Sequence, residues 1–104
     1  ELDLGLALPF LAQDAPTRAQ AGLAATLRPQ ANAVQTDPVS LSPAGFGRVA
    51  RAYLLCSQDR TILPDLQRAM VADSPCDPVI ALETGHFPQL TAPETLAAAI
   101  GRLA

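Results

Sequence analysis

The chain has 104 residues, which is enough for one small domain and leaves no room for two. Its net charge is −3 and its seven basic residues are scattered arginines, which excludes the basic patch of a nucleic-acid-binding protein. Hydrophobic residues make up 49% of the chain, yet the longest apolar run is far below the roughly 18 residues of a membrane span, so we expect no membrane partner.

The first twelve residues carry alternating leucines, at every second position from Leu2 to Leu8. Strict alternation is typical of a strand. Pro9 interrupts the pattern, because proline cannot donate a hydrogen bond to a neighbouring strand. The segment is therefore predicted to be an edge strand or an irregular lid.

Residues 14–28 predict a helix, with Asp14 as its N-cap and Pro16 in its first turn. Residues 29–43 contain three prolines and many small polar side chains, which favour an extended connector. A short helical turn is expected at residues 44–46.

The second half gives the stronger signals. Residues 49–57 form a short apolar run that predicts a buried strand, residues 64–73 predict a helix, and residues 79–82 predict a second buried strand. A strand–helix–strand unit of this length favours parallel strands joined by a right-handed crossover. Two parallel strands do not form a stable sheet alone, and the chain is apolar for its length, so we expect further sheet outside it.

A last helix is predicted near the end of the chain. Thr91 and Glu94 have the spacing of a capping box, and Pro93 suits a first turn. The apolar stripe of this helix consists of Leu96, Ile100 and Leu103.

Cys56 and Cys76 do not make a disulfide framework, and Cys56 is expected to be a small buried hydrophobe. With one histidine and no Cys/His/Asp cluster, neither a metal nor a cofactor is expected. The chain shows no signal-peptide pattern, which favours a cytoplasmic protein. It starts at Glu1 and not at methionine, so we expect it to derive from something longer.

Two side chains with catalytic potential each follow a predicted strand. Asp59 closes the first apolar run and His86, the single histidine, closes the second. Parallel sheets place chemistry at the carboxyl ends of their strands, so the two can meet there. An Asp that orients a His is the acid and base part of a Ser-His-Asp triad. The alternative is that Asp59 is a turn residue and His86 a structural histidine.

The third member of such a triad is missing. Its serine normally sits in a Gly-x-Ser-x-Gly turn, and no such motif occurs in these 104 residues. Ser40, Ser42, Ser57 and Ser74 lack the flanking glycines.

Around these residues the chain resembles the α/β-hydrolase superfamily, in particular the plant methyl-esterase and hydroxynitrile-lyase group with its bacterial esterase relatives. The similar segments are RAYLLCSQDRTILP at residues 51–64, Gln67-Arg68, and ETGHFPQLTAPE at residues 83–94. The resemblance implies the triad acid at Asp59 and the triad base at His86. It also implies that residues 1–45 end a helical cap and residues 46–104 form the C-terminal part of the hydrolase core.

The expected fold is thus α/β: the end of the cap, then the last two parallel strands and two helices of an incomplete sheet that needs an N-terminal partner segment. Leu4, Leu6, Leu8, Phe10 and Leu11 are then candidates to line a substrate pocket, or equally to form the cap core. Hydroxynitrile lyases of this group carry a lysine directly after the histidine. Phe87 occupies that position here. The candidate substrate-binding residues are Phe87, Leu4, Leu6 and Phe10.

The resemblance implies that the chain is part of a serine-dependent carboxylic ester hydrolase, which acts on a small-molecule ester. The N-terminal portion of the same hydrolase is the expected partner and carries the serine. Alternatives are a non-catalytic ligand-binding module with hydrolase architecture, and a hydroxynitrile lyase, which Phe87 disfavours.

Overall fold

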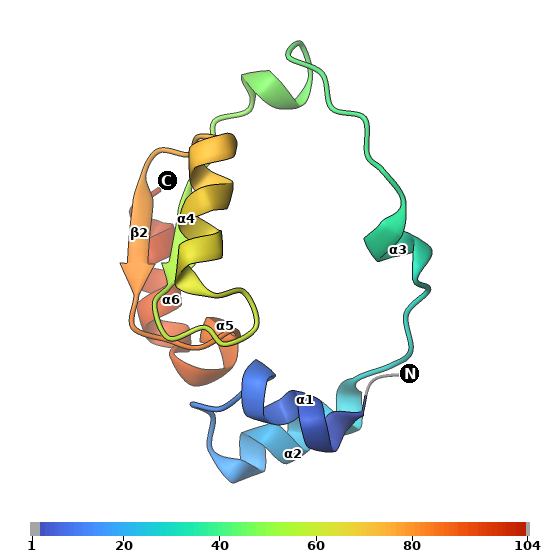
Figure 1. Cartoon of the computed structure of the whole chain (residues 1–104). Helices are drawn as coiled ribbons and strands as arrows, with labels where there is room; N and C mark the ends of the chain where they lie inside the picture. The colour runs from blue at the N-terminus through green and yellow to red at the C-terminus, as the bar shows by residue number, and fades with distance from the viewer. Residues whose placement is uncertain (1–2, 104) are drawn as a thin grey trace.

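The structure is a computed structural model that describes residues 3–103. Figure 1 shows the sheet and its helices on one side, a pair of helices below them, and a long connector that closes a ring. In chain order the elements are α1 (Leu4–Leu11), α2 (Thr17–Thr26), α3 (Ala33–Thr36), the 3₁₀-helix η1 (Phe46–Arg48), β1 (Tyr53–Cys56), α4 (Pro64–Asp73), β2 (Val79–Leu82), α5 (Pro88–Thr91) and α6 (Pro93–Gly101).

The strand or irregular lid predicted at the start of the chain is wrong, because this segment forms the helix α1. Asp3 caps the helix: its Oδ1 accepts from the backbone N–H groups of Gly5 at 2.9 Å and Leu6 at 3.3 Å. Leu4, Leu8 and Leu11 also have the i, i+4, i+7 spacing of one helical face, and all three are partly buried. Leu2 lies outside the described residues.

The helix predicted at residues 14–28 is confirmed as α2, but it begins at Thr17. Asp14 is not its N-cap: Pro16 occupies that position, and the Asp14 carboxylate accepts a hydrogen bond from Gly85 instead. The predicted extended connector contains the one-turn helix α3. The short turn expected at residues 44–46 appears two residues later, as η1.

The two predicted strands pair in parallel, as expected, with Tyr53 opposite Val79 and Cys56 opposite Leu82. β1 is shorter than predicted, whereas α4 and β2 have the predicted bounds. Figure 1 shows α4 in front of the strands and α6 behind them, so each face of this parallel pair carries one helix. The carboxyl ends of both strands therefore lie at one edge.

The last helix is confirmed as α6, but its predicted capping box does not form. Ala92 is the N-cap, without a side-chain hydrogen bond, and the Thr91 hydroxyl donates to the Phe87 carbonyl at 3.3 Å. Thr91 belongs to the additional helix α5, which the sequence pattern did not predict. The predicted apolar stripe is largely uncovered, since Ile100 and Leu103 are exposed and the buried residue of α6 is Ala99.

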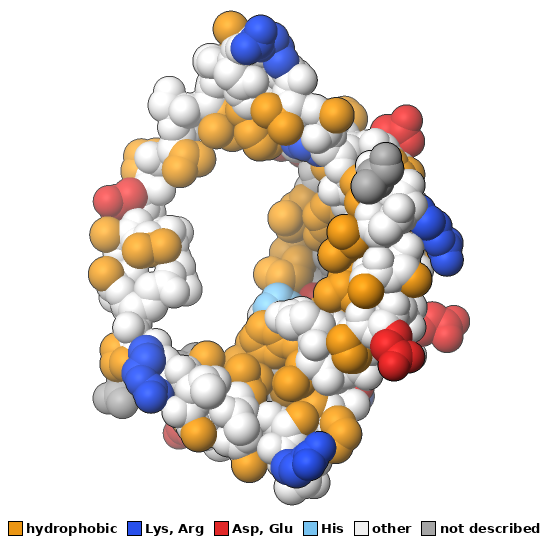
Figure 2. Space-filling model, turned by 180° about the vertical axis from the view of Figure 1, so that it is seen from behind, with side chains coloured by type: hydrophobic (Ala, Val, Ile, Leu, Met, Phe, Trp, Pro, Cys, Tyr) orange, Lys and Arg blue, Asp and Glu red, His pale blue; other side chains and the backbone are white. Residues whose placement is uncertain are grey.

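The described part of the chain does not close around one core. Its radius of gyration is 15.5 Å, whereas about 13 Å is typical of a compact domain of this length. Figure 2 shows an opening through the molecule, bordered on the sheet side by apolar side chains and by the histidine. Large apolar side chains are exposed around the sheet, at Leu63, Leu66, Met70, Val79 and Ile100. Among the helices described, none combines the length and the apolar character that crossing a membrane requires.

Candidate active site

Asp59 sits in a tight turn directly after β1. Its backbone N–H donates to the Cys56 carbonyl at 3.3 Å. Its carboxylate Oδ1 accepts from the backbone N–H groups of Thr61 at 2.7 Å and Ile62 at 3.0 Å. The residue is 6% exposed. These local bonds use one carboxylate oxygen and hold the other toward the neighbouring loop.

The other oxygen contacts His86, as the positions after the strands predict. Asp59 Oδ2 lies 2.9 Å from His86 Nδ1. An ionised carboxylate can only accept, so with a neutral ring this contact requires the hydrogen on Nδ1 and leaves the lone pair on Nε2. The His86 side chain is 26% exposed, which leaves the imidazole accessible while its partner is buried. This is the geometry of a general base oriented by an acid.

Gln67 supports the loop that carries Asp59. From α4 its side-chain Oε1 accepts from the Cys56 N–H at 2.9 Å, and its Nε2 donates to the carbonyls of Cys56 at 3.0 Å and Ile62 at 2.7 Å. It is 2% exposed. Gln67 thus ties the last residue of β1 to the acid loop. No role was predicted for Gln67, although Gln67-Arg68 is one of the segments that resemble the hydrolase group.

A cavity of about 520 Å³ opens beside His86. Its lining comes from three parts of the chain: Ala7, Phe10 and Leu11 of α1, Gln35 of α3, and Arg60, Thr61 and His86 of the loops that follow β1 and β2. Phe10 and Leu11 thus lie where a pocket role requires. Leu4, Leu6 and Leu8 do not line it, and Leu6 is 72% exposed.

The remaining candidate, Phe87, follows His86 in the chain and lies outside the cavity lining. Its ring meets the His86 ring edge to face, with centroids 5.0 Å apart and an interplanar angle of 65°. Gln35, Arg60 and Thr61 were not predicted as lining residues. Adjacency to Asp59 could have indicated Arg60, whereas nothing in the connector pattern singles out Gln35.

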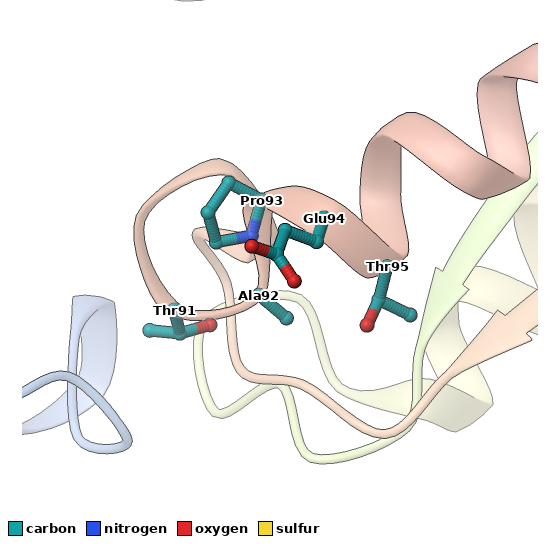
Figure 3. Close-up of a pocket in the computed structure, with 5 residues that line it drawn as sticks. All are labelled: Thr91, Ala92, Pro93, Glu94 and Thr95. Atoms are coloured by element: carbon teal, nitrogen blue, oxygen red, sulfur yellow. The ribbon is translucent and has the colours of Figure 1, made fainter.

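A second hollow, of about 350 Å³, lies at the turn between α5 and α6. Figure 3 shows its five lining residues, which are consecutive: Thr91, Ala92, Pro93, Glu94 and Thr95. It contains neither Asp59 nor His86. Because one exposed turn makes up its whole lining, we assign the chemistry to the cavity beside His86.

The fold and this site define a class of protein. Residues 2–99 match the model of the alpha/beta hydrolase family, and the chain belongs to that family of hydrolases. The predicted α/β-hydrolase fold with an incomplete parallel sheet is therefore confirmed.

Part of the chain is similar in sequence to plant methylesterases. The chain is 40% identical to Methylesterase 2 of Arabidopsis thaliana over 58 residues, which is 55% of this chain and 22% of that protein. It is 34% identical to Methylesterase 9 of the same plant over 62 residues, which is 59% of this chain and 24% of that protein. The predicted resemblance to methyl esterases is confirmed. These relatives are plant proteins, and the likeness to bacterial esterases stays a prediction.

Solved structures share the fold at low identity. A mutant of polyneuridine aldehyde esterase superimposes with a TM-score of 0.90 at 18% identity, over 99% of this chain and 42% of that one. Tomato methylketone synthase I in complex with 2-tridecanone gives a TM-score of 0.83 at 18% identity, over 98% of this chain and 41% of that one. The chain thus spans about a quarter of the methylesterases and about two fifths of these structures. The division into a cap at residues 1–45 and a core at residues 46–104 stays a prediction.

Proposed function

We propose that this chain supplies the acid, Asp59, and the base, His86, of a serine-dependent carboxylic ester hydrolase whose serine lies outside these 104 residues. The observation that carries the proposal is the 2.9 Å contact between Asp59 Oδ2 and His86 Nδ1 at the carboxyl edge of a parallel sheet, beside a cavity. That contact leaves Nε2 as the nitrogen that can accept a proton.

The mechanism is acyl transfer in two halves. His86 Nε2 takes the proton of the serine hydroxyl as the serine oxygen attacks the ester carbonyl, and Asp59 stabilises the imidazolium that forms. The imidazolium then returns the proton to the departing alkoxide, which leaves as an alcohol and yields an acyl-enzyme. In the second half His86 takes a proton from water, which attacks the acyl-enzyme, and the serine oxygen is reprotonated as the acid leaves.

The proposed partner is the N-terminal portion of the same hydrolase, which carries the serine and the oxyanion-hole donors. The chain covers only 21–26% of the length of the methylesterases that it matches, which leaves room for such a portion. The exposed apolar side chains around the sheet and the opening in Figure 2 also support a further segment that packs there.

The proposed substrate is a small carboxylic ester, and the names of the methylesterase relatives favour a methyl ester. The apolar side of the cavity, formed by Ala7, Phe10 and Leu11, suits an organic acyl group. Cyanohydrin cleavage is not favoured, since the side chain after His86 is the apolar Phe87, which cannot balance the charge of cyanide.

The test uses the complete hydrolase that contains this chain. We expect it to hydrolyse p-nitrophenyl acetate, and His86→Ala to lower kcat by at least about a thousandfold. Mandelonitrile, as the lyase substrate, should be left unchanged. A folded His86→Ala enzyme with near wild-type esterase activity contradicts the proposal. A complete protein without any esterase activity favours the non-catalytic binding module.

A further inference from the structure

Two adjacent side chains in the turn between α1 and α2 hold the two catalytic loops. Gln13 Nε2 donates to the Gln58 carbonyl at 2.7 Å, and Asp14 Oδ2 accepts from the Gly85 N–H at 2.7 Å. Each of these backbone groups belongs to the residue directly before a catalytic residue, Asp59 in one loop and His86 in the other. Side chains of this turn therefore contact residues 45 and 71 positions further along the chain, at the same sheet edge.

We propose that Gln13 and Asp14, here called the clamp, are positioning residues that set the spacing of Asp59 and His86. The proposal rests on the proposed function, because it assigns the clamp a role in the same reaction. It also makes the placement of α1 and α2 part of the catalytic geometry, since the residues that line the cavity from α1 and the clamp belong to one continuous segment.

The turn that carries the clamp is itself held in place. Ala12 and Ala15, which flank the two clamp residues, are both buried. Gln20 of α2 donates through its Nε2 to the carbonyls of Ala12 and Ala15, each at 3.0 Å, and the Ala15 N–H donates to the Ala12 carbonyl at 3.1 Å. The clamp side chains thus start from a fixed backbone, which lets their short bonds transmit position.

The clamp closes a ring of hydrogen bonds between the two loops. The Gln58 N–H donates directly to the Thr84 carbonyl at 3.0 Å, so the loops already meet on one side. Gln13 and Asp14 join Gln58 to Gly85 on the other side. The bond to Asp14 is charge-assisted, which makes it stronger than a bond between neutral groups.

Gly85 fits the clamp through its size. A Cβ atom there would lie 2.5 Å from Asp14 Oδ1 and 2.8 Å from Gln13 Nε2, closer than real contacts allow. Among the described residues no glycine has a positive φ, so close approach and not backbone conformation explains this glycine. Gly85→Ala should therefore push both clamp side chains away while leaving their chemistry unchanged.

The experiment measures kcat and KM of the complete hydrolase with a p-nitrophenyl ester. Gln13→Ala, Asp14→Ala and Gly85→Ala should each lower kcat by about 10- to 100-fold, because a displacement of about 1 Å can lose 100-fold in rate. KM should change less than about twofold, since neither clamp residue lines the cavity. Asp14→Asn keeps an oxygen that can accept from Gly85 and should restore kcat to within about fivefold of the wild type.

Asp3→Ala is the matched control. The Asp3 carboxylate also accepts backbone N–H bonds, but from Gly5 and Leu6 of its own helix and not from a residue directly before Asp59 or His86. It should lower the melting temperature without lowering kcat, whereas a clamp variant that still melts cooperatively should lose kcat.

The proposal is overturned if Gln13→Ala and Asp14→Ala keep kcat within twofold, or if Asp3→Ala loses as much kcat as they do. It is also overturned if the clamp variants raise KM at unchanged kcat. The His86→Ala variant distinguishes failure of the proposed function from failure of the clamp proposal. Full activity of His86→Ala contradicts the proposed function. An inactive His86→Ala variant together with fully active clamp variants contradicts the clamp proposal alone.

Discussion

Asp59→Asn isolates the orienting role of the acid, because it changes the hydrogen-bonding capacity of the side chain and almost nothing of its shape. In the wild type Oδ1 holds two backbone N–H groups, at 2.7 and 3.0 Å, and Oδ2 receives the His86 Nδ1 hydrogen at 2.9 Å. Asparagine has only one oxygen to divide between these two tasks.

The two possible orientations of the amide differ in energy. With its oxygen toward Thr61 and Ile62, the asparagine keeps both loop bonds and directs its NH₂ group at His86. The opposite orientation sets NH₂ against two N–H donors and loses two bonds at a buried site, at about 1 kcal/mol each or more. The first orientation should prevail. It forces the hydrogen of His86 onto Nε2, so the ring can no longer accept the serine proton.

The expected loss is about 10⁴-fold in kcat, the size known for the same change in a Ser-His-Asp protease, or about 5.5 kcal/mol of transition-state stabilisation. The assay is p-nitrophenyl ester hydrolysis by the complete enzyme, with circular dichroism to confirm folding. Asp65→Asn is the matched control: this carboxylate is fully exposed and, among residues 3–103, bonds only to Arg68, so kcat should not change. A folded Asp59→Asn enzyme within tenfold of wild-type kcat refutes the reasoning.

Two further substitutions test the surroundings of the pair. Gln67→Leu leaves the N–H and carbonyl of Cys56 and the carbonyl of Ile62 without their partner, and should destabilise the protein by about 2–4 kcal/mol in urea unfolding. A change below about 0.5 kcal/mol, no larger than for the exposed Gln89→Leu, would contradict this role. Phe10→Ala removes apolar cavity lining and should raise KM about three- to tenfold at nearly constant kcat. Val34 is exposed and precedes the lining residue Gln35 without lining the cavity itself, so Val34→Ala should leave KM unchanged. Equal effects of Phe10→Ala and Val34→Ala on KM would refute the pocket assignment.

The contact between Asp59 and His86 could be predicted from sequence because it depends on simple topology. Two apolar runs separated by a helix predict parallel strands, and parallel strands bring the residues that follow them to one edge. The structure places Asp59 and His86 there in direct contact.

The N-terminal half could not be predicted as well, because its signals were ambiguous or distant. The alternating leucines also satisfied helical spacing, and the cap at Asp3 decided for the helix α1. Asp14 has the chemistry of an N-cap, but its partner Gly85 lies 71 residues away. Such long-range bonds leave no local pattern in the sequence.

The central claim is that His86 activates a serine outside these 104 residues, and labelling with a fluorophosphonate tests it most directly. This reagent modifies an activated serine irreversibly. Mass spectrometry of the complete protein should find one modified serine, located outside the present chain, and His86→Ala should abolish the modification. Labelling of Ser40, Ser42, Ser57 or Ser74, or labelling that persists without His86, would contradict the account.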